Sequence, residues 1–160
     1  MYSHSTIFWD YEIVITRFNK WIEEQTDYSF ALGPFGALVT LQYSITMAPA
    51  SQPRNAIIGQ TVAMTVSLFI AYIDGIEKWI KQAIAPSISI AIMARLGVTH
   101  PPAGASALIF VSGEHNWGSM AMMLVANAIS ICLAVIINNS NEQRQYPIHW
   151  GLPTRTSLKS

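Results

Sequence analysis

The chain has 160 residues, of which 51% are hydrophobic and only 11% are charged, and its formal net charge is zero. An ordinary soluble domain carries about 25% charged residues, so this composition argues against a soluble protein. A neutral chain has no basic field that would attract nucleic acid. A single cysteine, Cys132, excludes an intrachain disulfide and any zinc-binding cysteine pattern. The length fits one domain.

Two apolar runs decide the class of protein. Ala56 to Ile73 has eighteen residues and Gly118 to Asn138 has twenty-one, and neither run contains a charge. A helix needs about 20 apolar residues to cross a bilayer, whereas a helix on a soluble core would show a polar stripe. We therefore predict an all-α, polytopic integral membrane protein. Its helical bundle should have about four spans, with short re-entrant or broken helices among them.

The N-terminal segment, residues 1–29, differs from the rest of the chain. Apolar and polar residues recur at helical spacing from Ile7 to Ile22, which predicts an amphipathic helix and not a signal peptide. Two interpretations remain open: an interfacial helix with Trp9 and Trp21 at headgroup level, or a surface that docks on a partner protein. Residues 30–150 should form the transmembrane domain, and residues 151–160 a flexible tail.

Shorter apolar segments lie around the two long runs. Phe30 to Ala48 carries several hydroxyl and amide side chains, which should face other helices or a wet cavity. After a charged connector, Asp74 to Lys81, a further span is expected from Gln82 to Val98, with Pro86 in its first turn. Ala103 to Val111 is too short to cross a bilayer, and whether it spans or re-enters stays open.

The distribution of positive charge predicts an orientation. With four crossings, the N-terminal segment, the 74–81 connector and the tail share one side, which carries seven of the nine Lys and Arg residues. Arg54 and Arg95 lie on the other side. The positive-inside rule then places both termini in the cytoplasm, the stroma or the matrix. The membrane would be a bacterial-type inner membrane or the inner membrane of a chloroplast or mitochondrion.

The stretch from Thr99 to Ser106 contains two consecutive prolines. Because each proline lacks an N–H and clashes with the preceding turn, a helix must end before them, although a proline is accepted at the start of a new helix. We expect one helix to stop near Gly97 and the next to begin at about Pro102. Its first N–H groups, with the helix dipole, would form a positively polarised pocket at membrane depth.

A second stretch looks similar. Pro34-Phe35-Gly36-Ala37 and Pro102-Ala103-Gly104-Ala105 each begin a polar-tinged apolar segment that is followed by a loop and a clean span. Gly- and Pro-interrupted segments at corresponding places in two halves point to a midplane site in transporters. The match covers only a few residues, so a chance similarity is the alternative.

Thr99-His100-Pro101-Pro102-Ala103-Gly104-Ala105 resembles the signature of the HPP family of small integral membrane proteins. Three further stretches agree in order and spacing: Gly33 to Ala37, Gln52 to Asn55, and Asn138-Asn139 with Arg144, Tyr146-Pro147 and Trp150. The resemblance implies four spans, a bacterial or plastid membrane and, as for some members, nitrite transport. Members usually carry a clear transmembrane helix ahead of the 32–36 segment, where this chain has the amphipathic Ile7 to Ile22 segment.

A transported anion would need donors and a cationic group. Arg54 would attract the anion or hold it through two hydrogen bonds, and His100, titrating near neutral pH, would couple its movement to a proton. Structural roles are the alternatives: Arg54 at the headgroups, His100 as a turn cap, and the glycines for close helix packing. The candidate anion-binding residues are His100, Arg54, Asn55, Thr99, Gly36, Ala37, Gly104, Ala105 and Ser106.

Two classes of function follow. One is a small-anion transporter or channel of the HPP type, with nitrite as the substrate that the resemblance implies. The other is a non-transporting accessory subunit of a larger respiratory or photosynthetic membrane complex. The expected partners are the lipid bilayer, a small inorganic anion, and either a homo-oligomer or other membrane subunits bound through the Ile7 to Ile22 helix. No catalytic motif, metal site or cofactor site is recognisable, so we expect a protein that is not an enzyme.

Overall fold

The computed structural model describes residues 32–113, 116–140 and 144–148, with isolated positions at 13, 17, 20, 21 and 24. The remainder of the 1–29 segment, including most of the predicted amphipathic helix, lies outside the described residues. The predicted tail, residues 151–160, lies outside them as well. The fold is therefore the fold of the predicted transmembrane domain.

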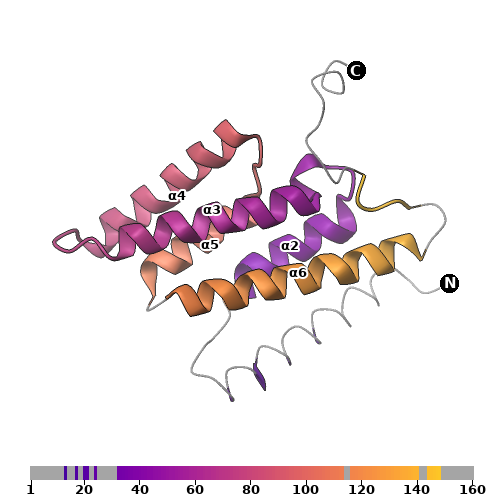
Figure 1. Ribbon diagram of the computed structural model, residues 1–160, viewed down its shortest axis with the longest axis horizontal. Coiled ribbons are helices and arrows are strands. Elements are labelled where there is room, and N and C mark those ends of the chain that lie inside the picture. Colours follow the sequence, from indigo (N-terminus) through magenta and orange to yellow (C-terminus); the bar gives the residue numbers. More distant parts are fainter. Residues whose placement is uncertain are drawn as a thin grey trace.

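All the regular secondary structure in this part of the chain is helical, which confirms the all-α prediction (Figure 1). In chain order the elements are α2 (Leu32–Ser44), the 3₁₀ turn η1 (Pro49–Ser51), α3 (Pro53–Ala71), α4 (Lys78–Leu96), α5 (Pro101–Ser112) and α6 (Trp117–Asn139).

Two of the described helices, α3 and α6, are long and apolar enough to cross a membrane, and both lie where the sequence predicts them. At about 1.5 Å per residue they reach roughly 28 and 34 Å, against a hydrocarbon core of about 30 Å. Helix α4 equals α3 in length, at 19 residues, but it carries Lys78, Lys81 and Arg95. Helices α2 and α5 have only 13 and 12 residues, so neither crosses a bilayer alone.

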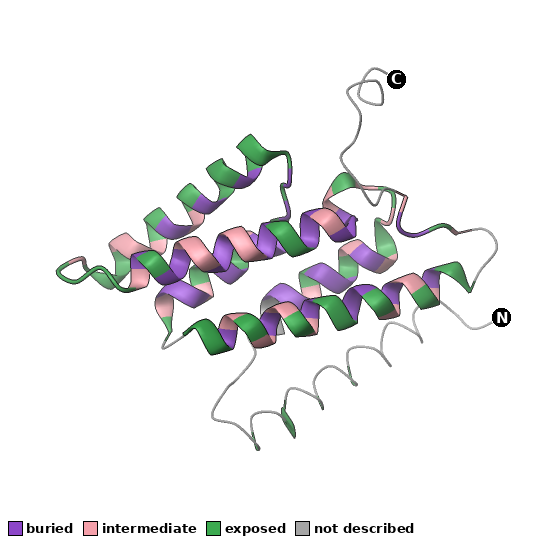
Figure 2. Cartoon of the chain, in the orientation of Figure 1, coloured by how far each residue is buried: buried purple, intermediate pink, exposed green. Residues whose placement is uncertain are grey.

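The burial pattern of α6 separates a membrane helix from the core helix of a soluble protein. Its outward positions are apolar and include Trp117, Val125, Ile129 and Ile136 (Figure 2). Its buried residues include Ser119, Asn127, Ser130 and Asn138. A helix on a soluble core has the reverse arrangement, with its polar side chains in water. The outer face of α6 therefore suits lipid, and the polar groups of the helix point into the protein.

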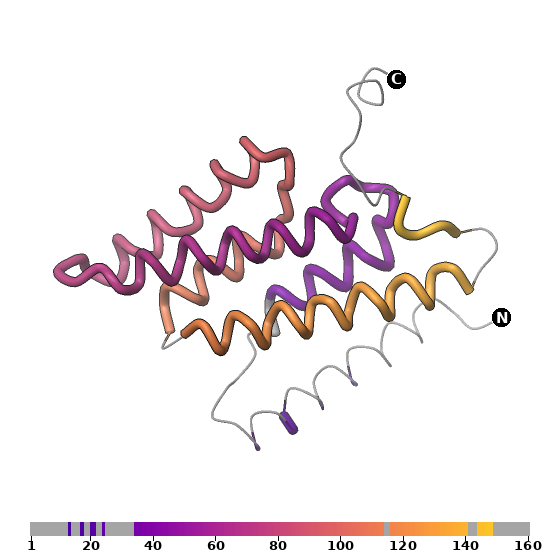
Figure 3. Tube along the Cα trace, in the orientation of Figure 1, coloured from indigo at the N-terminus to yellow at the C-terminus, as the bar shows by residue number. Residues whose placement is uncertain are grey.

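The short helix α5 reverses the chain and changes the predicted topology (Figure 3). Its last turn returns to the start of α4, where Gln82 Nε2 donates to Ser112 Oγ at 2.8 Å. Helix α6 begins at that end too, since the Trp117 ring lies 5.8 Å from the Phe69 ring at the end of α3. We call this the Trp117 end, and we call the opposite end, where α3 and α5 begin, the His100 end.

The grouping of segments behind the predicted orientation is therefore wrong in one respect. Helix α6 finishes at the His100 end, where Asn138 Nδ2 donates to the Gln42 carbonyl at 3.0 Å. Residues 144–148 continue at that end, while the connection from α3 to α4 lies at the Trp117 end. The prediction counted four crossings and took no account of α5 as a return path. A segment too short to span a bilayer still carries the chain back when it packs inside a bundle.

Two predicted boundaries near α4 can be compared with the structure. Helix α4 begins at Lys78 and not at Gln82, so Pro86 lies in its interior instead of its first turn. The end of α4 agrees with the prediction. The helix stops at Leu96, and Gly97 adopts the left-handed conformation with φ of 64°, which glycine accepts without strain. Helix α5 then begins at Pro101, directly after His100.

Small side chains let α3 approach its neighbours closely. Helix α3 occupies the middle of the bundle and packs on α4, α5 and α6. Buried Ala63 of α3 meets Ala103 and Ala107 of α5 together with Met93 of α4. In a membrane, where the hydrophobic effect does not drive helices together, such close backbone contact contributes most of the packing energy.

Candidate functional site

The His-Pro-Pro element folds back over the first turns of α3. His100 precedes α5 as its N-cap and is fully buried. Its Nδ1 lies 2.8 Å from the carbonyl oxygen of Ala50 in η1. Because a carbonyl can only accept, Nδ1 carries the hydrogen, and this partner assigns the tautomer. In the neutral ring Nε2 then presents a lone pair, and this atom has no hydrogen-bond partner among the described residues.

The burial of His100 decides its charge. The side chain belongs to the connection between α4 and α5, outside the helices, and desolvation lowers its pKa from 6.5 to about 4, against a smaller opposite effect of the hydrogen bond to Ala50. The imidazole is therefore neutral at pH 7. Our expectation that His100 titrates near neutral pH does not agree with this environment. A protonated ring would be a buried positive charge, away from water and without a compensating negative charge.

Arg54 and Asn55 hold the connection between α4 and α5 against the start of α3. Arg54 Nη1 donates to the Gly97 carbonyl at 3.3 Å, and Asn55 Nδ2 donates to the Thr99 carbonyl at 3.2 Å. A guanidinium also suits the C-terminus of α4, where the helix dipole is negative. These two predicted site residues, distant from His100 in the sequence, thus hold the residues directly before it. Their hydrogen bonds go to backbone carbonyls and do not converge with His100 on one pocket.

Gly59 of α3 provides the space that His100 occupies. A Cβ at this position would lie 2.8 Å from His100 Cβ, 3.2 Å from the Val98 carbonyl oxygen and 3.3 Å from Met93 Sδ. Real Cβ atoms do not approach other atoms so closely, so only glycine allows the connection to lie this near to α3. The sequence analysis did not select Gly59, and a glycine in a long apolar helix is a weak signal for such a contact.

The expected donor pocket at the start of α5 does not form. Pro101 and Pro102 have no N–H, and the Ala103 N–H donates to the His100 carbonyl at 3.0 Å. The side chain of Ser106, predicted as a neutral donor, is buried and donates to the Pro102 carbonyl at 3.3 Å. Helix N-termini bind anions through their first free N–H groups, and here Pro101 and Pro102 lack two of those groups while Ala103 uses a third.

The other predicted helix-start residues lie too far along their helices. Gly36 and Ala37 follow four residues of α2, and Ala105 follows four residues of α5, whereas only the first groups of a helix lack internal partners. Gly104 faces α4, where a Cβ would lie 3.7 Å from Ile90 Cδ1. This agrees with the close-packing role that was its alternative.

The buried polar face of α6 was missed by the sequence analysis, whereas Gln42 of α2 faces another helix, as expected for the polar side chains of the Phe30 to Ala48 segment. Ser130 Oγ donates to Gln42 Oε1 at 2.7 Å, and Asn127 Nδ2 donates to the Ala56 carbonyl at 3.2 Å. We had treated the last apolar run as clean because it is uncharged. The signal was present, since Asn127, Ser130 and Asn138 recur at spacings that place them on one helical face.

Residues 144–148, which we call the clamp residues, hydrogen-bond to the chain around η1, the turn that contains Ala50. The hydroxyl of Tyr146 donates to the Ser51 carbonyl at 2.6 Å, and the Ile148 N–H donates to Gln52 Oε1 at 2.9 Å. Arg144 Nη1 donates to the Tyr43 carbonyl at 3.1 Å. The chain after α6 thereby helps to position the carbonyl that orients His100.

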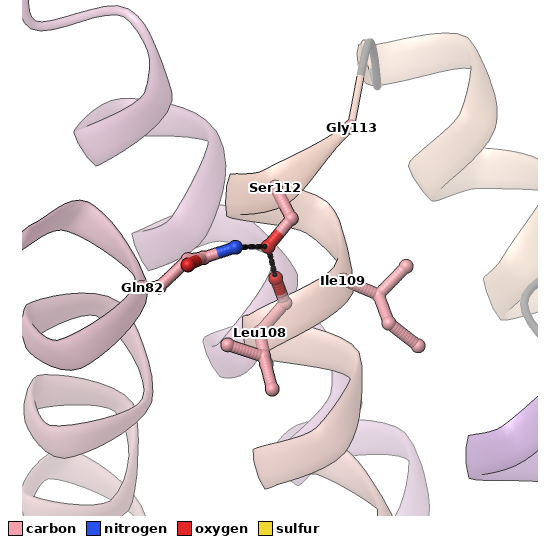
Figure 4. Close-up of a pocket in the computed structure, with 5 residues that line it drawn as sticks. All are labelled: Gln82, Leu108, Ile109, Ser112 and Gly113. Atoms are coloured by element: carbon pink, nitrogen blue, oxygen red, sulfur yellow. Dashed lines mark hydrogen bonds between the residues drawn. The ribbon is translucent and has the colours of Figure 1, made fainter. Parts of the chain in front are cut away.

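A separate open groove of about 470 Å³ lies at the Trp117 end (Figure 4). Its lining residues are Gln82, Leu108, Ile109, Ser112 and Gly113. The only polar side chains among them, Gln82 and Ser112, are hydrogen-bonded to each other. None of the predicted site residues lines this groove, so it is distinct from the His100 cluster.

A family model described as HPP, transmembrane region, matches residues 11–147. The match begins ahead of Leu32 and takes in most of the Ile7 to Ile22 segment, so it does not support our expectation that this chain departs from the family there. The His-Pro-Pro element lies within the match, as do Arg144 and Tyr146, whereas Ile148 lies one residue beyond its end.

Two curated relatives from Dictyostelium discoideum are each named only as a transmembrane protein. One is 31% identical over 147 residues, which cover 86% of this chain and 46% of the relative. The other is 30% identical over 128 residues, which cover 74% of this chain and 45% of the relative. The chain thus spans less than half the length of these relatives, and no solved structure matches it. From the family match and the two relatives, the chain belongs to the HPP family of integral membrane proteins.

Proposed function

We propose that this protein transports a small inorganic anion such as nitrite across its membrane. The observation that carries the proposal is the fully buried His100, with Nδ1 fixed on Ala50 and Nε2 without a partner among the described residues. A buried polar atom without a partner is costly and calls for an explanation. Ionisable residues inside membrane proteins commonly mark the path of an ion or a proton.

The mechanism follows from the neutral state of His100. An anion alone would meet the Nε2 lone pair and be repelled, and an imidazolium alone would be penalised by burial. Together, a proton on Nε2 and an anion beside it form a hydrogen-bonded pair with no net charge. Anion and proton should therefore bind and leave together, with one proton per monovalent anion. In this scheme Arg54, which is half-buried, attracts the anion toward the site.

The remaining properties of the proposal come from the sequence. The membrane is a bacterial-type inner membrane or the inner membrane of a chloroplast or mitochondrion. The protein works without a catalytic step, and it assembles as a homo-oligomer or with other membrane subunits through the Ile7 to Ile22 segment.

Nitrite uptake into liposomes tests the proposal. Purified protein, His100→Ala and His100→Asn are each reconstituted, with protein-free liposomes as the measure of passive leak. The asparagine can keep a hydrogen bond to the Ala50 carbonyl but cannot take up a proton. We expect wild-type uptake to saturate and to follow an inward proton gradient, and both variants to lose it. Folded, inserted wild-type protein without uptake above the leak would refute transport, as would full activity in His100→Asn.

An accessory subunit is the second candidate. It is favoured by the hydrogen bonds of Arg54 and Asn55, which go to the backbone carbonyls of Gly97 and Thr99 and so stabilise the fold. On this view the His-Pro-Pro element is a structural corner. Purification from native membranes separates the two candidates, because a subunit should be isolated only with its complex and should show no uptake alone.

A further inference from the structure

A set of buried polar side chains lies along the inner face of α6, and the His100 site does not use them. We call this set the α6 seam. It consists of Asn127, Ser130 and Asn138 of α6, Gln42 of α2 and Gln60 of α3. Its members come from three helices, and hydrogen bonds connect α6 to the other two. Asn138 and Ser130 bond to Gln42 of α2, and Asn127 bonds to the Ala56 carbonyl, one turn before Gln60 of α3.

Three atoms of the α6 seam are unsatisfied. Gln42 Nε2, Gln60 Oε1 and Asn127 Oδ1 are buried and have no hydrogen-bond partner among the described residues. Polar side chains that serve only to hold membrane helices together should bond to one another. Here one donor and two acceptors remain unpaired, although Ser130, the α6 partner of Gln42, is only three residues from Asn127. A closed seam of this kind is less stable than one whose amides have partners.

The unsatisfied acceptors lie near the middle of the two candidate spans. Asn127 is central in α6 (Trp117–Asn139), and Gln60 is close to the centre of α3 (Pro53–Ala71). At this depth lipid offers no hydrogen bonds. Their missing partners must therefore come from within the protein or from molecules that enter it.

A positive charge stands where the α6 seam reaches the His100 end. Arg144, which is half-buried, donates from Nη1 to Asn138 Oδ1 at 3.3 Å. Within the described part of residues 32–148 the acidic residues are Asp74 and Glu77, both in the connection at the opposite end. At the His100 end, the α6 seam thus has a guanidinium with no described carboxylate near it. This positive charge favours the approach of an anion.

We propose that the α6 seam is a second site on the permeation path, closed in this structure, that opens between α6 and its neighbours α2 and α3 to admit water and a small inorganic solute. Water has donors for the two amide oxygens and an acceptor for Gln42 Nε2. The identity of the solute rests on the proposed function, but the hydration of the seam does not. The outward faces of α3 and α6, which carry exposed Ile57, Phe69 and Ile129 among other apolar side chains, stay in lipid.

Cysteine accessibility tests the proposal, and the chain supplies a matched control. Cys132 lies two residues from Ser130 at nearly the same depth but is exposed on the outer face of α6. We would compare wild type, which has only Cys132, with the double variant Ser130→Cys, Cys132→Ser, in which the single thiol lies in the seam. The probe is aqueous Ag⁺ added to proteoliposomes, and blocked thiol is measured by mass after denaturation and alkylation. Arg95→Cys in the Cys132→Ser background, exposed at the His100 end, shows that this end faces the reagent.

We expect the thiol at position 130 to be blocked at least about tenfold faster than Cys132, because a thiol in an apolar environment is rarely ionised. Equal rates at the two positions, or a thiol at 130 that stays free while Arg95→Cys reacts, would overturn the proposal. Nitrite uptake is measured on the same preparations. A reactive seam without uptake would refute only the substrate, whereas uptake with a dry seam would refute only the path.

Discussion

Gly59→Ala is the substitution whose effect the structure defines most sharply. The new Cβ would lie 2.8 Å from His100 Cβ and 3.2 Å from the Val98 carbonyl oxygen. Neither atom is the end of a flexible side chain, so the connection between α4 and α5 must move away from α3. Overpacking of this kind costs about 1–3 kcal/mol, while alanine gains up to about 1 kcal/mol over glycine in a helix. The net loss of stability should therefore reach at most about 2 kcal/mol.

Gly36→Ala is the matched control. Gly36 also lies in a helix, and a Cβ there would meet nothing within 4 Å. It should gain the same helix propensity without the clash, so the two variants should differ by the overpacking cost itself, about 1–3 kcal/mol. The assay is a denaturant titration of the purified protein at constant detergent concentration, which measures the free energy of reversible unfolding. The reasoning fails if Gly59→Ala is as stable as Gly36→Ala.

Three further predictions concern single hydrogen-bonding groups. Tyr146→Phe should lose about 1 kcal/mol of stability with its bond to Ser51. Since burial raises the pKa of Tyr146, wild type should also lose stability as the pH rises above about 10, and a pH titration in which the variant shows the same alkaline loss would contradict this. Asn55→Ala should cost about 1 kcal/mol, and Asn55→Asp more, because a carboxylate cannot donate to the Thr99 carbonyl; unfolding curves that coincide with wild type would exclude the contact. Asn127→Leu should leave stability unchanged or raise it, since it removes an unsatisfied buried oxygen. The same variant should reduce uptake. An unfolding midpoint well below wild type would show that the amide is structural.

The sequence was most informative where backbone chemistry leaves few choices. Gly97 and the two prolines after His100 determine where one helix stops and the next begins, because glycine accepts a left-handed C-cap and proline cannot continue a helix. The two uncharged runs likewise predicted the positions of α3 and α6 as the long apolar helices. Each of these features depends on residues within a few positions of one another, so a single sequence contains the whole signal.

Features that depend on distant partners could not be predicted. Arg54 looked like an anion ligand, but its partner is the Gly97 carbonyl, 43 residues away. Nothing near Arg54 in the sequence indicates that contact. The direction of α5 was missed for a related reason, since its length excludes a full crossing but does not say how a short helix packs between longer ones. The polar face of α6 was visible in the spacing of Asn127, Ser130 and Asn138, and an analysis that seeks only charges overlooks it.

A single turn of α3 connects the two sites. Gly59 bears on His100 from one side, and the Ala56 carbonyl, three residues earlier, accepts the bond from Asn127 in the α6 seam. A proton and an anion arriving at His100 would need space beside a side chain that already packs closely against α3 at Gly59. Packed helices shift as units because their interiors are not compressible. A displacement of this turn would therefore change the Ala56–Asn127 contact, and with it the closure of the seam. Under the two proposals above, binding of a proton and an anion at His100 would act on the closure of the α6 seam through this turn.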